Sequence, residues 1–288
     1  MSDQKEKLET IKKLREMTGV GFSDCKSAIE ETGGDIDKAV EFLRKKGIAK
    51  ASKKMSRTAN EGLVLAHKEN NSVSLLEVNS ETDFVAKNKD FINFCKELSV
   101  LNFKYKGDLD ALKNAKMKNS STVDESLIDL ISKIGEKIIV RRAKFFDSSD
   151  GQIYYYIHNT IEKDLAGKII AAVKVSNINE NTDIGFKLAM HIAASGPLAI
   201  DEKKLDKNII NKELEIIKAE LDNSGKKPEI ADKIAKGKIN KFISDNTLLN
   251  QPWFMDPKIS VKKFLNESNS SNPINIIEFA RFKLGEGI

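Results

Sequence analysis

One stretch decides the fold of this chain: Glu77-Val78-Asn79-Ser80-Glu81-Thr82-Asp83-Phe84-Val85-Ala86-Lys87-Asn88. An apolar run that is typical of a strand, Val73 to Val78, changes there into a helical pattern. Phe84 lies seven residues before Phe91, so an unbroken helix would bury it on the apolar stripe. The polar flanks indicate instead a corner at the surface, where Phe84 would contact another protein. Periodicity alone favours burial.

Two parts of the chain repeat one order of elements: strand, polar turn, strand, helix and closing strand. The predicted strands cover 62–67, 73–78 and 137–145 in the first part, and 153–158, 168–175 and 274–283 in the second. Such a duplication predicts two similar subdomains, each a small antiparallel sheet covered by helices. The fold class is therefore α+β, and the strand order stays open.

Three short helices are predicted before the first strand. Ser23 and Asp35 can cap the second and third helices, and Gly47 is expected past the end of the third. Such a small bundle usually binds something. Phe22 either fills its core, which spacing slightly favours, or contacts a partner at the surface.

A further pair of helices interrupts the second subdomain. Apolar residues recur at helical spacing over 205–221 and 230–242, with a turn at 223–228, which predicts a projecting antiparallel hairpin. The loop that starts at Gln251-Pro252-Trp253-Phe254 is expected to fold onto the core.

These patterns divide the chain into four units. They are a three-helix domain with a basic linker (1–56), a first core subdomain (57–146), a second core subdomain (147–200 with 243–288), and the inserted helical hairpin (201–242).

Composition indicates a globular protein of the cytoplasm. The 288 residues are 40% hydrophobic and 32% charged, with a formal net charge of +5, well short of a dedicated nucleic-acid binder. Cys25 and Cys95 are far apart, which suggests neither a disulfide framework nor a zinc site. We expect no membrane span and no targeting segment.

Motifs for catalysis are absent from the sequence. It has neither a Gly-x-x-x-x-Gly-Lys-[Ser/Thr] loop nor a Gly-x-Gly-x-x-Gly motif after a strand, so we expect no bound nucleotide and no cofactor. The three histidines lack metal-ligand spacing. We interpret His67 as solvated, His191 as buried on a helix stripe, and His158 as a surface residue of a sheet. The chain is therefore not expected to be an enzyme or to hold a metal.

The segment 44–57 carries seven basic residues and no acid. A solvated linker is the favoured interpretation. The alternative is an arm of a nucleic-acid-binding accessory protein, although the segment lacks the aromatic residues that stack on single strands. We expect no direct contact with nucleic acid.

Short motifs follow one another along nearly the whole chain: Leu14-Arg15-Glu16-Met17-Thr18-Gly19-Val20-Gly21, Asp24-Cys25-Lys26, Gly33-Gly34-Asp35, Glu77-Val78-Asn79, Thr82-Asp83-Phe84-Val85-Ala86, Tyr156-Ile157-His158, Met190-His191-Ile192-Ala193-Ala194-Ser195 and Gly285-Glu286-Gly287. In order and spacing they resemble the elongation factor Ts family. The resemblance implies that the N-terminal helices form a UBA-like domain and that the inserted hairpin is a coiled coil, through which self-association is possible. It also implies a guanine-nucleotide exchange factor that binds elongation factor Tu, both GDP-bound and nucleotide-free.

The same resemblance implies where the partner binds. Phe84 would insert between two helices of the GTPase while Asp83 hydrogen-bonds beside it, and Thr82 and Val85 complete the motif that disturbs the magnesium site. Further contacts are implied for Arg15, Phe22, Ser23, Lys26 and His158. Phe22 and Ser23 replace two methionines of the family pattern. Since the sequence ends at Ile288, we expect the contact of a C-terminal helix, present in some members, to be absent.

Overall fold

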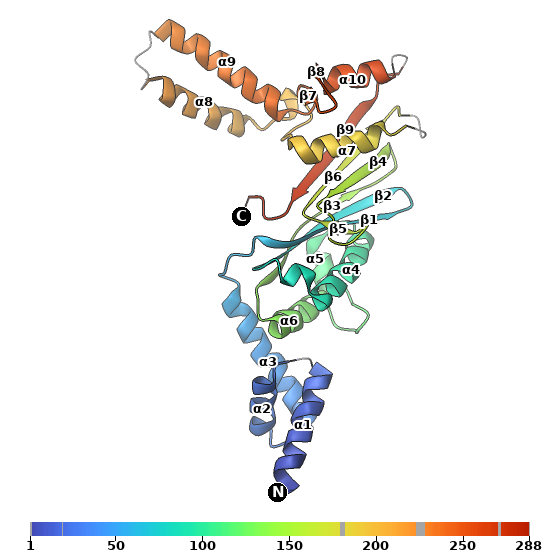
Figure 1. Ribbon diagram of the computed structural model, residues 1–288, viewed down its shortest axis with the longest axis vertical. Coiled ribbons are helices and arrows are strands. Elements are labelled where there is room, and N and C mark those ends of the chain that lie inside the picture. Colours follow the sequence, from blue (N-terminus) through green and yellow to red (C-terminus); the bar gives the residue numbers. More distant parts are fainter. Residues whose placement is uncertain (1, 19, 179–181, 223–227, 270–271, 288) are drawn as a thin grey trace.

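The computed structural model describes residues 2–18, 20–178, 182–222, 228–269 and 272–287. Its shape is elongated (Figure 1): three N-terminal helices occupy one end, a pair of antiparallel helices occupies the other, and the β-sheets lie between them. The two larger sheets are antiparallel and carry helices on their outer faces. The prediction of an α+β fold is confirmed.

The first sheet has the strand order β3-β2-β1-β5. Its strands are β1 (Glu61–Glu69), β2 (Ser72–Ser80), β3 (Ile138–Phe146) and β5 (Ala166–Gly167). The short helix η1 (Val85–Lys87) and the helices α4 (Lys89–Lys104), α5 (Leu109–Asn114) and α6 (Val123–Ile134) follow β2. Helices α5 and α6 and strand β5 are not among the predicted elements.

The second sheet has the order β4-β6-β9 and repeats the first sheet's β1-β2-β3 arrangement. Its strands are β4 (Gln152–His158), β6 (Ile169–Ser176) and β9 (Asn275–Lys283), and α7 (Ile184–Ser195) covers it. In both sheets the closing strand pairs with the second strand of the hairpin. Both pairings also contain a bulge in the closing strand at the same place, at Arg141 in β3 opposite Glu77 and Val78, and at Ile277 in β9 opposite Lys174 and Val175. The predicted repeat is confirmed.

The two sheets pack face to face because side chains alternate along their strands. In β1, Leu63 and Leu65 face α4, whereas Val64 and Ala66 face the other sheet. The same alternation holds in the second sheet, where Val173 packs against α7. The core is thus layered as helix, sheet, sheet and helix.

The N-terminal helices are α1 (Ser2–Thr18), α2 (Phe22–Glu31) and α3 (Ile36–Lys54). Their small core contains Ile11, Leu14, Cys25, Ala28, Ile29, Ala39 and Leu43. Asp35 caps α3 by accepting the amide N–H of Lys38, as predicted. The predicted cap at Ser23 is wrong, since α2 begins at Phe22 with Gly21 in the cap position and no side-chain cap bond.

Helix α3 does not end before Gly47 but continues to Lys54 and packs against α6. A Cβ at Gly47 would lie 2.6 Å from Ser132 Oγ, so the glycine lets the two helices approach closely. Ala51, one turn further on, is buried in the core of the first sheet. The prediction of a helix end at Gly47 is therefore wrong, and the segment 44–57 is helical as far as Lys54, with most of its side chains exposed.

The inserted hairpin consists of α8 (Lys207–Asp222), which follows the short helix η2 (Glu202–Lys204), and α9 (Pro228–Asn246). Ile217, Leu221 and Ala235 are buried between its two helices. Most of the predicted turn, residues 223–227, lies outside the described residues, as do Gly19 and Ile288.

The loop after α9 is ordered, as predicted. It forms a small ribbon of β7 (Pro252–Trp253) and β8 (Asp256–Ser260), followed by α10 (Val261–Ser268). The Trp253 ring is buried, stacked at 4.3 Å on Phe264 of α10 and at 5.3 Å on His191 of α7.

A buried carboxylate joins the two sheets. Glu77, fully buried in β2, accepts hydrogen bonds from Arg141 Nη1 at 2.8 Å, Arg142 Nε at 2.5 Å and the backbone N–H of Gly285 at 3.0 Å. Burial raises the pKa of Glu77, but these donors outweigh it and hold the pKa below its ordinary value. The turn after β9 is thereby fastened to the first sheet.

We expect Glu77→Gln to lower the free energy of unfolding at pH 7 by about 3 kcal/mol, because two arginines lose their buried partner. Since the folded pKa lies below the ordinary value of 4.5, the difference from wild type should begin to shrink below pH 4.5 and should be lost as the pH falls through the folded pKa. Urea unfolding between pH 7 and about pH 4 measures both effects. Glu61→Gln, which removes a surface partner of Lys168, should cost less than about 1 kcal/mol; an equal loss in both variants would contradict the role of Glu77.

Candidate functional site

The corner between β2 and α4 presents Phe84 to solvent. Its side chain is 77% exposed, the most of any large apolar side chain among the described residues. Asn88 explains this, because its side chain caps α4 by accepting the amides of Asp90 and Phe91. The regular helix therefore starts at Lys89, and Phe84 never joins its apolar stripe. The burial that periodicity predicts is wrong.

The corner has a buried base. Val85 and Ala86, in η1, are 4% and 1% exposed and belong to the core of the first sheet. The Val85 side chain therefore anchors the corner on the core of the first sheet. Asp83 is partly exposed and forms an ion pair with Lys87 at 3.2 Å.

Two glutamates hold the backbone of the corner. Thr82 donates its amide N–H and its hydroxyl to the carboxylate of Glu136, at 3.0 and 2.8 Å. Glu81 accepts the amide of Lys137 at 2.6 Å and pairs with Arg57 at 3.3 Å. Burial raises the pKa of Glu81, but the Lys137 amide and the Arg57 charge outweigh it, so the pKa lies below its ordinary value.

The same region receives the end of α3. Lys137 Nζ donates to the carbonyl oxygens of Met55 and Arg57, both at 2.7 Å. Lys54 Nζ donates to the carbonyl of Gly135. The N-terminal helices and the Phe84 corner are therefore attached to one loop, residues 135–137.

The other implied contact residues lie on separate surfaces. Arg15, at the end of α1, and Phe22, Ser23 and Lys26, on the first turns of α2, are all exposed. Phe22 is 42% exposed, so the interpretation that it fills the core of the bundle is wrong. Phe22 and Lys26 share one face of α2 at a spacing of four residues.

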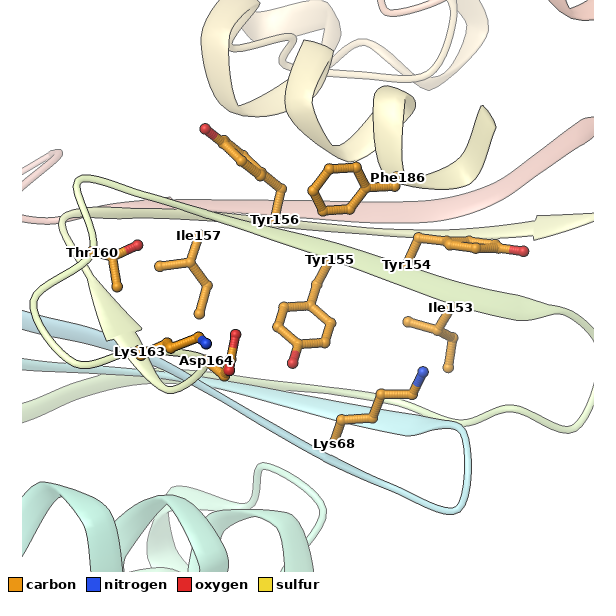
Figure 2. A pocket seen from close by; sticks show the side chains of 10 residues that line it. All are labelled: Lys68, Ile153, Tyr154, Tyr155, Tyr156, Ile157, Thr160, Lys163, Asp164 and Phe186. Carbon is orange, nitrogen blue, oxygen red and sulfur yellow. The ribbon is translucent and has the colours of Figure 1, made fainter. Parts of the chain in front are cut away.

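His158 ends β4, an edge strand of the second sheet, and its side chain is exposed. Tyr156 Oη lies 3.2 Å from His158 Nδ1, and Phe186 of α7 stands edge-on to the Tyr156 ring at 5.6 Å. Figure 2 shows Tyr156 and Phe186 on one side of the strand and Tyr155 and Ile157 on the other, around an open hollow of about 420 Å³. The interpretation of His158 as a surface residue of a sheet is confirmed.

The remaining histidines differ from each other in burial. His191 is fully buried, as predicted, with Nε2 3.0 Å from Gln251 Oε1, and burial lowers its pKa. His67 is half-covered by Phe103, whose ring lies 5.2 Å away, so the prediction of a solvated histidine is wrong. In the described ranges no three His, Cys, Asp or Glu side chains are grouped so that they could hold a metal ion.

The basic segment 44–57 is largely engaged within the chain. Arg44 pairs with Glu125, Lys46 with Asp24 at 3.3 Å, and Arg57 with Glu81. These side chains remain partly exposed, but each is paired with a carboxylate of the same chain, whereas a nucleic-acid arm would present its charges unpaired. The geometry gives that alternative no support.

Sequence reasoning missed Glu136 and Lys137, which hold the corner. Both follow Gly135, which ends α6 in a left-handed conformation with φ of 86°. A helix-stop glycine before a strand could have marked the loop, but no sequence pattern gives its partners across 54 residues.

Among the described residues, no helix has both the length and the apolar character that crossing a membrane requires.

Comparison with known proteins shows the family of the chain. Residues 81–286 match the family described as Elongation factor TS, and the match begins within the corner. The chain belongs to the elongation factor Ts family. Its role is therefore that of a factor in translation elongation, part of protein biosynthesis.

Relatives named Elongation factor Ts align along almost the entire chain. The one from Methylococcus capsulatus is 40% identical, across 96% of this chain and 92% of its own length. Those from Nitrobacter hamburgensis and Rickettsia felis are 39% and 38% identical, each across 96% of this chain, and across 92% and 91% of their own lengths.

The corner's geometry predicts that adjacent substitutions change stability by very different amounts. Val85→Ala removes two buried methyl groups and should lower the free energy of unfolding by about 2 kcal/mol. Phe84→Ala removes an exposed ring and should change it by less than about 0.5 kcal/mol. Urea unfolding of both variants measures this. A larger loss for Phe84→Ala would show that the ring packs on the core.

Proposed function

We propose that this chain is a guanine-nucleotide exchange factor for elongation factor Tu. It binds the GDP-bound GTPase in the cytoplasm, promotes the release of GDP, and holds the nucleotide-free form until GTP binds. It makes and breaks no covalent bond in this role. Family membership and the geometry of the Phe84 corner support the proposal.

The proposed function depends mainly on the exposure of Phe84. The Phe84 ring is 77% exposed and therefore accessible to a partner, and because Val85 and Ala86 are buried, the backbone that carries it loses little freedom when the ring enters a gap. Asp83 beside it is available to exchange its intramolecular partner Lys87 for a donor on the GTPase.

The energy of burying one phenylalanine is sufficient for exchange. GDP and the factor must weaken each other's binding, and a tenfold weakening needs about 1.4 kcal/mol of coupling. Full burial of a Phe side chain yields about 2–3 kcal/mol. That energy would displace two helices of the GTPase and disturb its magnesium site, which contributes to GDP binding.

The remaining implied contact residues would add further contacts with the GTPase. Arg15, Phe22, Ser23 and Lys26 would touch the GTPase from the N-terminal helices, and Phe22 supplies the apolar part. His158 would contact it from the edge of the second sheet. Thr82 and Val85 act from inside the chain by supporting the corner.

The division of the chain into units follows from the same proposed family role. Residues 1–56 would form a UBA-like domain, 57–146 and 147–200 with 243–288 the two core subdomains, and 201–242 a coiled coil available for self-association. Separate apolar clusters in the N-terminal helices and in the α8–α9 hairpin support this division. The β5 strand crosses it, since its residues pair with β1 of the first sheet.

The test is the release of a fluorescent GDP analogue from elongation factor Tu. Wild type should accelerate release, and Phe84→Ala should reduce the acceleration about tenfold or more, because the inserted ring is lost. Val100→Ala is the matched control: it truncates another exposed apolar side chain of the first subdomain, on α4, and should behave like wild type. Equal activity of wild type and Phe84→Ala, or no acceleration by wild type, would disprove the proposal.

A further inference from the structure

The loop from Gly135 to Lys137 and the corner hold each other by a reciprocal exchange of hydrogen bonds. Glu81 accepts the amide of Lys137, the residue after Glu136. Glu136 in turn accepts the amide of Thr82, the residue after Glu81. The two strands concerned stop pairing one step earlier, at Ser80 and Ile138. The two carboxylates therefore continue the contact between the segments of β2 and β3 beyond the end of their β-ladder.

We propose that Glu136 is a positioning residue for nucleotide exchange: its carboxylate fixes the corner so that Phe84 projects outward. This inference rests on the proposed function of the Phe84 corner. Glu136 itself does not touch the GTPase in this scheme; it acts through Thr82.

The corner depends on such an anchor because Phe84 cannot fix itself. With 77% of its surface exposed, its ring has few packing contacts that would set its direction. The β2–β3 ladder ends at Ser80, and η1 begins only at Val85. Between these points Glu136 binds both polar groups that Thr82 can donate, in a half-buried setting where charged acceptors are strong.

Loss of the anchor has a definite physical consequence. A corner that samples several conformations must be ordered when the partner binds, and this ordering lowers the effective affinity and rate. This loss of affinity and rate arises only if Phe84 is the group that Glu136 positions. In a chain that already lacks the Phe84 ring, removal of Glu136 should have no further effect on exchange.

The experiment uses the full chain and two measurements. Amide hydrogen exchange at Thr82, followed by NMR, reports on the anchor without any partner. The release of the fluorescent GDP analogue from elongation factor Tu reports on exchange. The variants are Glu136→Ala, Glu136→Gln, Phe84→Ala and the double variant of Glu136→Ala with Phe84→Ala.

Asp108→Ala is the matched control. Asp108 also accepts two backbone amides, those of Asp110 and Ala111, both at 3.0 Å, and it caps α5 in the same subdomain. Its loss should reduce stability to a similar extent without touching the corner.

We expect Glu136→Ala to speed hydrogen exchange at Thr82 about tenfold and to reduce catalysed GDP release about tenfold, because a charge-assisted hydrogen bond is lost. Glu136→Gln, which keeps one oxygen acceptor, should restore part of both. The double variant should match Phe84→Ala alone, and Asp108→Ala should match wild type in both measurements.

Three results would overturn the inference: unchanged hydrogen exchange at Thr82 in Glu136→Ala, a double variant whose losses multiply, or an equal loss of GDP release in Asp108→Ala. Failure of the proposed function has a different signature. If wild type does not accelerate GDP release while Glu136→Ala still frees the Thr82 amide, the corner is positioned by Glu136 but serves another purpose.

Discussion

The buried carboxylate of Glu77 is the constraint on which the rest of the molecule depends. A bulge in β3 places Arg141 and Arg142 on the same side of the strand, so that two guanidinium groups reach one carboxylate. Arg142 also donates to the carbonyl of Lys283 and lies 4.4 Å above the Phe282 ring, which ties the first sheet to the last strand. The corner follows the end of β2, only a few residues after Glu77 in the chain.

Much of the sheet architecture could be predicted, because each strand alternates its side chains and each hairpin has a polar turn. The repeat in the order of elements carried this prediction through both subdomains. Periodicity failed at Phe84 for a local reason: Asn88 breaks the helix that the spacing implied. Resemblance to the family indicated the outward direction of Phe84, whereas the burial of its neighbour Val85 follows from the packing of η1 on the first sheet.

The remaining failures involve partners that are distant in sequence. Gly47 resembles a helix stop, yet it is a crossing point whose partner, Ser132, belongs to a helix that the patterns did not reveal. The basic residues on either side of it, Arg44 and Arg57, have no partner in the local sequence, and only the fold brings Glu125 and Glu81 beside them. Glu136 carries no motif at all. In each case the side chain's role is set by tertiary packing, which a local pattern does not contain.

Helix α3 runs without a break from the N-terminal bundle to the loop that holds the Phe84 corner. Its 19 residues form a rod about 28 Å long at 1.5 Å per residue. Its first turns, with Ala39 and Leu43, belong to the bundle that carries Phe22, and its later turns, held at Gly47 and Met55, lead to the corner that carries Phe84. A partner that binds both Phe22 and Phe84 must present its two receptive surfaces at the distance that separates these side chains. The chain could thus discriminate by distance, rejecting proteins whose two receptive surfaces are spaced differently even when each surface alone would fit.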